Sequence, residues 1–320
     1  MRTATKIWLI IAAFLVLIGC IIFGGIMGML KWDFSQLSTN TYETNLHTIH
    51  EDFSNITIVA DTAGIVFTPS DNLEAAVICH EQKNVTHSVT VVDGSLVIEV
   101  VDSRKWYEHI GIHADTPKIT LSVPQGEYGA LSIKSSTGSI EIPEAFHFES
   151  MDITVSTGSV TSSASASGQI AIKASTGSIR VNNISVGSLA LSVSTGKVTA
   201  SNVNCRDDVQ VGVTTGKADL TNISCRNLTS TGDTGSITLN HVLAAGTMSV
   251  ERSTGDVKLN GCDAAELLLI TDTGDITGSL LSEKIFLTYT DTGRVNVPQT
   301  ATGGKCEIRT DTGDIKITIQ

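Results

Sequence analysis

A Thr-Gly dipeptide recurs along the chain from residue 138 onward, and apolar residues keep fixed positions around it. The intervals between its glycines are 19 or 20 residues, from Gly138 to Gly313. An apolar residue stands two positions after each of the ten glycines and often again four positions after, as in Ile140 and Ile142. Period-two alternation with many β-branched side chains predicts short strands that bury one face.

The Thr-Gly pair is predicted to form the corner between two strands, where glycine supplies a backbone angle that other residues resist. A strand repeat of constant length describes a β-solenoid, in which each coil stacks on the one before. At about 4.8 Å per coil, ten coils would make a rod roughly 45–50 Å long. We therefore predict an all-β fold, a single-stranded β-solenoid (β-helix) of about ten 19–20-residue coils over residues 131–320. The corner glycines are Gly138, Gly158, Gly177, Gly196, Gly216, Gly235, Gly255, Gly274, Gly293 and Gly313.

The segment TDTGDI, at residues 271–276 and 310–315, contains the Asp-Thr-Gly that also marks the catalytic aspartate of aspartic proteases. In other coils the position before the threonine holds serine or threonine, as in Ser136 and Thr214. These residue types share a short side-chain oxygen that can accept a backbone N–H in a turn. A catalytic carboxylate could not be exchanged for serine along an array, so Asp272 and Asp311 are interpreted as turn residues. Coils of such constant length leave no loops to build a cleft, and we predict that the chain is not an enzyme.

Aspartates gather near the C-terminus, where stacked carboxylates would repel one another. A Ca²⁺ ion with oxygen ligands would relieve that repulsion. The repeat does not match the nonapeptide of calcium-binding β-rolls, and Ser253 and Arg294 interrupt the column. The favoured interpretation is a solvated turn edge without a cofactor or metal, with calcium as the alternative. The candidate ligands for that alternative are Asp272, Asp275, Asp291, Asp311 and Asp314.

Asparagines recur at the second corner of three coils, at Asn183, Asn202 and Asn222. Three residues further on, Cys205 and Cys225 share a column, which would put them on successive coils within reach of a disulfide. The favoured alternative is that cysteine serves there as a small core residue. The six cysteines show no metal-like spacing and the histidines are irregularly spaced, so the sequence does not predict a zinc site.

The N-terminus contains 24 uncharged residues, 7–30, a length that can span a bilayer as a helix. Arg2 and Lys6 precede this run, which favours a cytoplasmic segment 1–6, a signal anchor 7–30 and an exterior remainder. Lipoprotein processing at Cys20 is the alternative to an uncleaved anchor. Residues 31–130 hold less regular strand patterns, and the sequence DTAGI at 61–65 resembles a degenerate corner. We expect this region to be β-rich and to cap the solenoid.

The exterior part is strongly acidic. Once Arg2, Lys6 and Lys31 are set aside, 18 basic residues remain against 33 acidic ones, a net charge of −15. Such a surface repels nucleic acid and anionic lipid. The chain stops on a full coil with no evident cap, and we expect self-association through this C-terminal coil, Thr310–Gln320, to be available.

The segments KWDFSQLST at 31–39 and SRKWYEHIGI at 103–112, with the ladder of STGS and DTGD corners, resemble the bacterial putative adhesin family. The resemblance implies a membrane-anchored or secreted β-solenoid, common in Gram-positive bacteria, and it supplies no catalytic residues. It implies a role in adhesion, and for some relatives in envelope-stress signalling. We therefore predict a single-pass cell-membrane protein with an extracellular C-terminal domain that binds a cell-wall component or an envelope protein. The alternative is a self-assembling scaffold or an envelope-stress signalling component.

Overall fold

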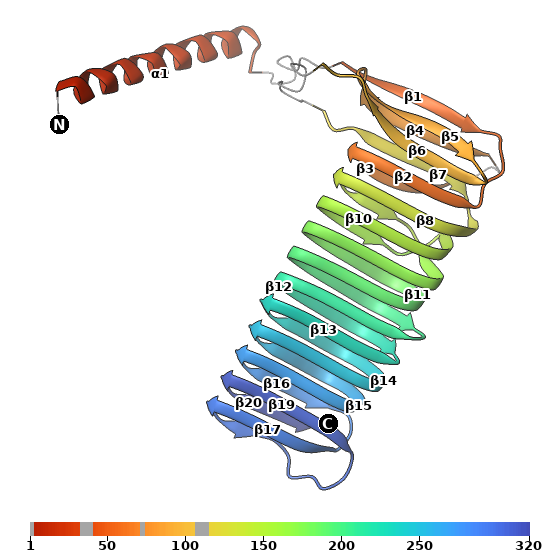
Figure 1. The fold of residues 1–320 in the computed structure, drawn as a ribbon, viewed down its shortest axis with the longest axis vertical. Coiled ribbons are helices and arrows are strands. Elements are labelled where there is room, and N and C mark those ends of the chain that lie inside the picture. Colours follow the sequence, from red (N-terminus) through yellow and green to blue (C-terminus); the bar gives the residue numbers. More distant parts are fainter. Residues whose placement is uncertain (1–2, 33–40, 71–73, 106–114) are drawn as a thin grey trace.

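The computed structural model of the chain describes residues 3–32, 41–70, 74–105 and 115–320. Helix α1 (Thr3–Met29) contains the one stretch in these ranges, Thr5–Met29, that is long and apolar enough to cross a membrane, with a mean hydropathy of 3.0. Most of its large apolar side chains, such as Trp8 and Leu17, are exposed, whereas Met27 is buried. All remaining regular structure is strand, stacked into the long rod of Figure 1.

The N-terminal end of the rod is closed by antiparallel strands, as expected for a cap. Strand β4 pairs antiparallel with β1 and β7, and β5 pairs antiparallel with β6. Strands β2 and β3 join this cap to the solenoid, since β2 pairs in parallel with both β6 and β8, and β3 with both β7 and β9. These strands are β1 (Tyr42–Ile49), β2 (Asn55–Thr62), β3 (Gly64–Ser70), β4 (Ala75–Gln82), β5 (Val85–Val92), β6 (Ser95–Asp102) and β7 (Lys118–Pro124).

The predicted β-solenoid is confirmed. Its coils pair in parallel and in register, so that corner glycines meet, as in Gly158 with Gly177 and Gly196 with Gly216. The expected boundary between residues 130 and 131 falls inside β8, and the degenerate corner at 61–65 makes the first coil. The strands are β8 (Gly126–Thr137), β9 (Ile140–Ile142), β10 (Phe146–Ser162), β11 (Ser165–Cys205), β12 (Asp208–Cys225), β13 (Asn227–Thr234), β14 (Ile237–Thr254), β15 (Val257–Thr273), β16 (Ile276–Leu280), β17 (Lys284–Thr292), β18 (Val295–Asn296), β19 (Gly304–Thr312) and β20 (Ile315–Ile319).

The core is a set of apolar columns running along the inside of the rod. The residue two positions after each corner glycine is fully buried in most coils, including Ile140, Val160 and Ile179. Burying such a side chain stabilises the fold by about 1.5–3 kcal/mol. Near the cap, the interior is filled by Phe67, whose ring lies edge-on to those of Phe146 and Phe148. The core cluster contains no residue of α1.

The last coils do not stack in chain order, which corrects the expectation that the C-terminal coil ends the rod. Strand β15 pairs with β19, and β19 pairs in turn with β17. Strand β20 likewise lies between β16 and β18. The segment 304–320 is therefore inserted between two earlier coils, and β17 with β18 forms the end of the rod. Figure 1 shows β17 at this end, opposite the cap.

Local sequence explains this order. A Cβ on Gly304 would lie 1.7 Å from the carbonyl oxygen of Ala265, and one on Gly303 would lie 1.8 Å from that of Glu283. The consecutive glycines thus allow β19 to enter between its two neighbours. Pro298 follows β18, and a proline that cannot donate to a ladder is tolerated at an edge. The proline-containing coil accordingly takes the outermost place.

Candidate functional site

The corner glycines form a column in which the backbones of successive coils touch. Each of the ten has a positive φ, from 127° at Gly235 to 157° at Gly293. A Cβ added at any of them would lie between 1.6 and 2.4 Å from a carbonyl oxygen of the adjacent coil. The corner therefore excludes every side chain for two independent reasons, and its role is structural.

The aspartates after the corner glycines form a hydrogen-bonded ladder along the rod. The Asp256 carboxylate accepts the backbone N–H of Asp275 at 3.2 Å, and the Asp275 carboxylate accepts that of Asp314 at 2.8 Å. The Asp314 carboxylate then accepts the N–H of Arg294 at 2.9 Å and contacts the Arg294 guanidinium at 3.2 Å. These bonds with Arg294 hold the pKa of Asp314 below its ordinary value.

The five aspartates of the calcium hypothesis fall into two rows and do not converge. Asp272, Asp291 and Asp311 precede their corners and are exposed, whereas Asp275 and Asp314 belong to the ladder. Across the described residues, no three of these carboxylates lie within 4.8 Å of one another. The interleaved coil order also separates Asp272 from Asp291 by the coil of Asp311. The ladder carboxylates of Asp275 and Asp314 accept backbone hydrogen bonds, and the fold does not bring the five aspartates to one point.

The asparagine ladder at the second corner is present, and its backbone conformation extends over two further coils. Asn202 donates to Asn183 at 2.8 Å, and Asn222 donates to Asn202 at 2.9 Å. All three have a left-handed backbone, with φ between 53° and 56°. His241 and Gly261 continue the same conformation in the next two coils, with φ of 52° and 58°. Asparagine and glycine adopt this conformation most readily, and this preference explains their recurrence.

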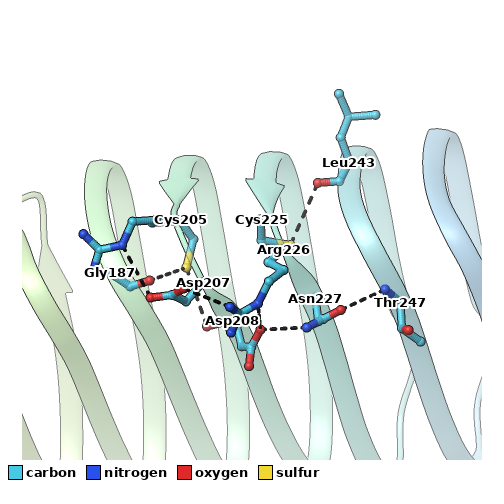
Figure 2. Close-up of polar contacts among 10 residues, drawn as sticks. Gly187, Cys205, Asp207, Asp208, Cys225, Arg226, Asn227, Leu243 and Thr247 are labelled. Carbon is cyan, nitrogen blue, oxygen red and sulfur yellow. Dashed lines mark hydrogen bonds and ion pairs between the residues drawn. The ribbon is translucent and has the colours of Figure 1, made fainter.

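The two aligned cysteines lie beside a network of charged residues (Figure 2). Cys205 and Cys225 are buried free thiols, as expected of small core residues. Burial, with the charges of Cys205 and Asp208, raises the pKa of Cys225 to about 12. Thiols with a raised pKa stay protonated at neutral pH and are poor nucleophiles. Next to the two thiols, Arg226 contacts Asp207 at 3.3 Å and Asp208 at 3.2 Å.

The network of Figure 2 continues from coil to coil, and its polar side chains already have hydrogen-bond partners. Asn227 donates to the Asp208 carboxylate at 2.8 Å and accepts the backbone N–H of Thr247 at 2.9 Å. The hydrogen bonds from Arg226 and Asn227 hold the pKa of Asp208 below its ordinary value. The network therefore acts as an external brace that joins three coils.

The cap contains a polar cluster that sequence reasoning missed. The Glu81 carboxylate is buried and accepts hydrogen bonds from Asn45 at 2.7 Å and from the ring Nδ1 of His87, also at 2.7 Å. His87 lines a cavity of about 310 Å³ together with Tyr42 and Asp115. The spacing of these residues in the chain gives no known motif, because β1, β4 and β5 bring them together only in the folded cap. Trp106 and Tyr107, an adjacent aromatic pair that the sequence offers as core or cap residues or, as the alternative, as a recognition pair, lie outside the described residues.

The far end of the rod exposes an apolar strand edge. Between Lys284 and Asp291, strand β17 has no charged residue, and it pairs on one side only, with β19. The outward side chains of Ile285, Leu287 and Tyr289 are 44%, 51% and 49% exposed. Unpaired edges of this kind are sites at which another strand can add.

The profile of the Toastrack DUF4097 family matches the sequence at residues 53–229 and 204–320. No curated protein matches the chain. Among solved structures, a putative adhesin from Bacteroides fragilis NCTC 9343 is similar at 15% identity and a TM-score of 0.44, over 87% of this chain and 97% of that one.

Two similar structures come from Parabacteroides distasonis ATCC 8503. A putative adhesin matches at 11% identity with a TM-score of 0.47, covering 75% of this chain and 98% of that one. A putative lipid binding protein matches at 17% identity with a TM-score of 0.46, covering 75% and 95%. With TM-scores below 0.5, these structures do not bear on function.

Proposed function

Because the chain belongs to the Toastrack DUF4097 family, we propose that it is a non-catalytic, single-pass membrane protein that holds its β-solenoid outside the cell. There the rod binds components of the cell envelope. The apolar helix α1 supports the anchor, since it is long enough to cross a bilayer and contributes no residue to the core cluster of the rod. Arg2 and Lys6 ahead of it favour a cytoplasmic N-terminus.

The observation that carries this proposal is the repetition of the rod's polar surface. The aspartate ladder, the asparagine ladder and the charged network around Arg226 all run from coil to coil. Within each of them, the polar groups bond to one another. A surface of this kind offers similar weak contacts at regular spacing, about 4.8 Å per coil. A polymer with a repeating structure can then gain affinity from many such contacts at once.

Co-sedimentation of residues 32–320 with isolated Gram-positive cell walls tests the proposal. This fragment contains the whole core cluster. Saturable pelleting with the walls, unaffected by EDTA, is the expected result. No pelleting above that of an unrelated acidic protein would contradict envelope binding through a wall polymer. Pelleting lost with EDTA would instead indicate a bridging divalent ion.

A second candidate function, self-assembly as a scaffold or as an envelope-stress component, is favoured by the exposed edge of β17. The outward apolar side chains Ile285, Leu287 and Tyr289 stand on an otherwise acidic molecule. A second copy could pair along the same edge about a two-fold axis and cover these side chains in both copies. The self-association expected of Thr310–Gln320 is thus relocated to β17, because β19 and β20 are paired on both sides.

Sedimentation velocity of residues 32–320 tests self-assembly. The expected result is a dimer that Leu287→Lys converts to a monomer, because the lysines would oppose each other at the paired edge. Leu243→Lys is the matched control, since Leu243 is 44% exposed and lies in the middle of the rod. A wild-type monomer at all concentrations, or equal effects of both substitutions, would contradict pairing through β17.

A further inference from the structure

Three potential metal ligands of different types meet inside the cap. Cys79 and Glu81 lie on β4, and His87 lies on β5. They are 0%, 1% and 6% exposed, and one ligand atom from each lies within 4.8 Å of the others. No other group of this kind occurs among the residues that the structure describes.

The buried Glu81 carboxylate places a negative charge inside the cap. Asn45 and the backbone N–H of His87 donate to it at 2.7 and 2.8 Å, and the His87 ring donates at 2.7 Å. Carboxylates are almost never fully buried unless paired. Glu81 has no lysine or arginine partner among its described contacts, so its compensation depends on hydrogen bonds and His87.

The second ring nitrogen of His87 has no partner. Nδ1 lies against Glu81, whereas Nε2 is buried and makes no hydrogen bond. Buried polar atoms are normally satisfied, and each exception calls for an explanation. His87 also lines the 310 Å³ cavity, whereas Cys79 and Glu81 do not.

We propose that Cys79, Glu81 and His87 bind one divalent transition-metal ion of the zinc class. Thiolate, imidazole and carboxylate are the ligands that Zn²⁺ takes, and three protein ligands with a fourth, open position form a common arrangement. Small side-chain movements convert separations below 4.8 Å to metal–ligand bonds of about 2.0–2.3 Å. A water molecule would occupy the fourth position.

Binding of the ion would leave the site with no net charge. The Cys79 Sγ–H bond breaks, the sulfur–metal bond forms, and the proton leaves to solvent. The His87 ring proton moves from Nδ1 to Nε2, and Nδ1 takes the metal. One thiolate and one carboxylate then balance the two positive charges of the ion. Asn45 keeps its hydrogen bond to the other Glu81 oxygen and orients that ligand, as outer partners of metal ligands do.

Cobalt titration of the full-length protein in detergent tests the site. Co²⁺ reports sulfur ligation through a thiolate-to-metal charge-transfer absorption. The protein carries Cys20→Ser throughout, because Cys20 is an exposed thiol on α1. After removal of metal with a chelator, one equivalent of Co²⁺ is expected to produce the absorption, and Zn²⁺ to abolish it. Absence of the absorption at one equivalent would overturn the proposal without bearing on envelope binding.

Variants assign the ligands. Cys79→Ser should lose the charge-transfer absorption, and His87→Gln should weaken Co²⁺ binding at least about tenfold. Cys262→Ser is the matched control, since Cys262 is equally buried but lies in the solenoid. The melting temperature separates misfolding from ligand loss: Zn²⁺ should raise it in the wild type and in Cys262→Ser but not in His87→Gln. A charge-transfer absorption that survives Cys79→Ser would show that Cys79 is not the sulfur ligand.

Discussion

At the scale of single residues, the corner glycines show how closely the coils approach. Gly216 has a φ of 137°, and a Cβ there would lie 1.7 Å from the carbonyl oxygen of Gly196. Gly212, in the same strand, has no such restriction, because its nearest neighbour would be the Ser192 hydroxyl at 3.5 Å. Two glycines four residues apart thus differ in how much space each has for a side chain.

We expect Gly216→Ala to destabilise the solenoid by more than about 2 kcal/mol, because strain and the carbonyl clash add. Gly212→Ala should change stability by no more than about 1 kcal/mol. Thermal unfolding of residues 32–320, followed by circular dichroism, measures the difference. Equal melting temperatures for the two variants would show that the corner tolerates a side chain.

Arg252 is the one arginine in the described core, and burial lowers its pKa to about 10. Its guanidinium donates to the Ser230 hydroxyl at 2.9 Å and to the Glu251 carbonyl at 3.0 Å. The next coils place Thr271 and Thr310 in the same column. The column therefore accepts a smaller residue at this position.

Ser230→Ala should destabilise the fold by about 1–3 kcal/mol, because it removes an acceptor from a buried cation. In an Arg252→Thr background, the same substitution should cost less than half as much. A double-mutant cycle in thermal unfolding measures this coupling. If Ser230→Ala had the same effect in both backgrounds, the hydroxyl would not be supporting the guanidinium.

At the scale of elements, the end coil is attached to the rod through a charged contact that depends on pH. The pKa of Asp314 is lowered from 3.8 by its bonds to Arg294 on the outermost coil. Because the folded value lies below the unfolded one, this stabilisation is present above pH 3.8 and is lost as the pH falls through the folded pKa.

Asp314→Asn should therefore lower the melting temperature at neutral pH and have a progressively smaller effect as the pH falls below 3.8, the ordinary pKa of an aspartate. Melting temperatures of the wild type and the variant across this range provide the measurement. Asp233→Asn serves as the control, since Asp233 is an exposed corner aspartate. A difference between wild type and Asp314→Asn that does not depend on pH would mean that the carboxylate charge is not responsible.

The elements themselves were largely predictable, because period-two alternation and the Thr-Gly interval each mark a strand or corner directly. The asparagine ladder was predictable for the same reason, whereas its continuation at His241 was hidden by a change of residue type. The order of the last coils was not evident, since coils with the same corner can stack in either order. Pro298 and the pair Gly303-Gly304 are the sequence features related to this order. Their effect becomes clear only from the pairing of β19 with β15 and β17.

The cap site was unpredictable for a different reason. The three ligands lie on two strands of an antiparallel hairpin, Cys79 and Glu81 on β4 and His87 on β5. The hairpin has no repeated pattern, and the spacing of the three residues does not place them on one face of it. Their proximity depends on the folded cap. Repeats predict contacts between equivalent positions, and the cap has no equivalent positions to compare.

At the scale of the whole molecule, the chain is a rod with two different ends. One end is closed by the antiparallel cap, which follows helix α1 in the chain, and the other presents β17 (Figure 1) together with β18. The proposed envelope contacts belong to the sides of the rod, and the proposed self-assembly belongs to its far end. Both depend on which coil is outermost.

The most direct test of this account is therefore the order of the last coils, measured with engineered cysteine pairs in residues 32–320. Thr273 and Thr312 are paired neighbours, as are Thr312 and Thr292. Neighbouring coils are about 4.8 Å apart, within disulfide range, whereas two steps are roughly 9.6 Å. We predict that Thr273→Cys with Thr312→Cys forms a disulfide under mild oxidation, detected by peptide mass mapping. The pair Thr273→Cys with Thr292→Cys should not form one. The opposite result would mean that the coils stack in chain order and that Thr310–Gln320, not β17, forms the end of the rod.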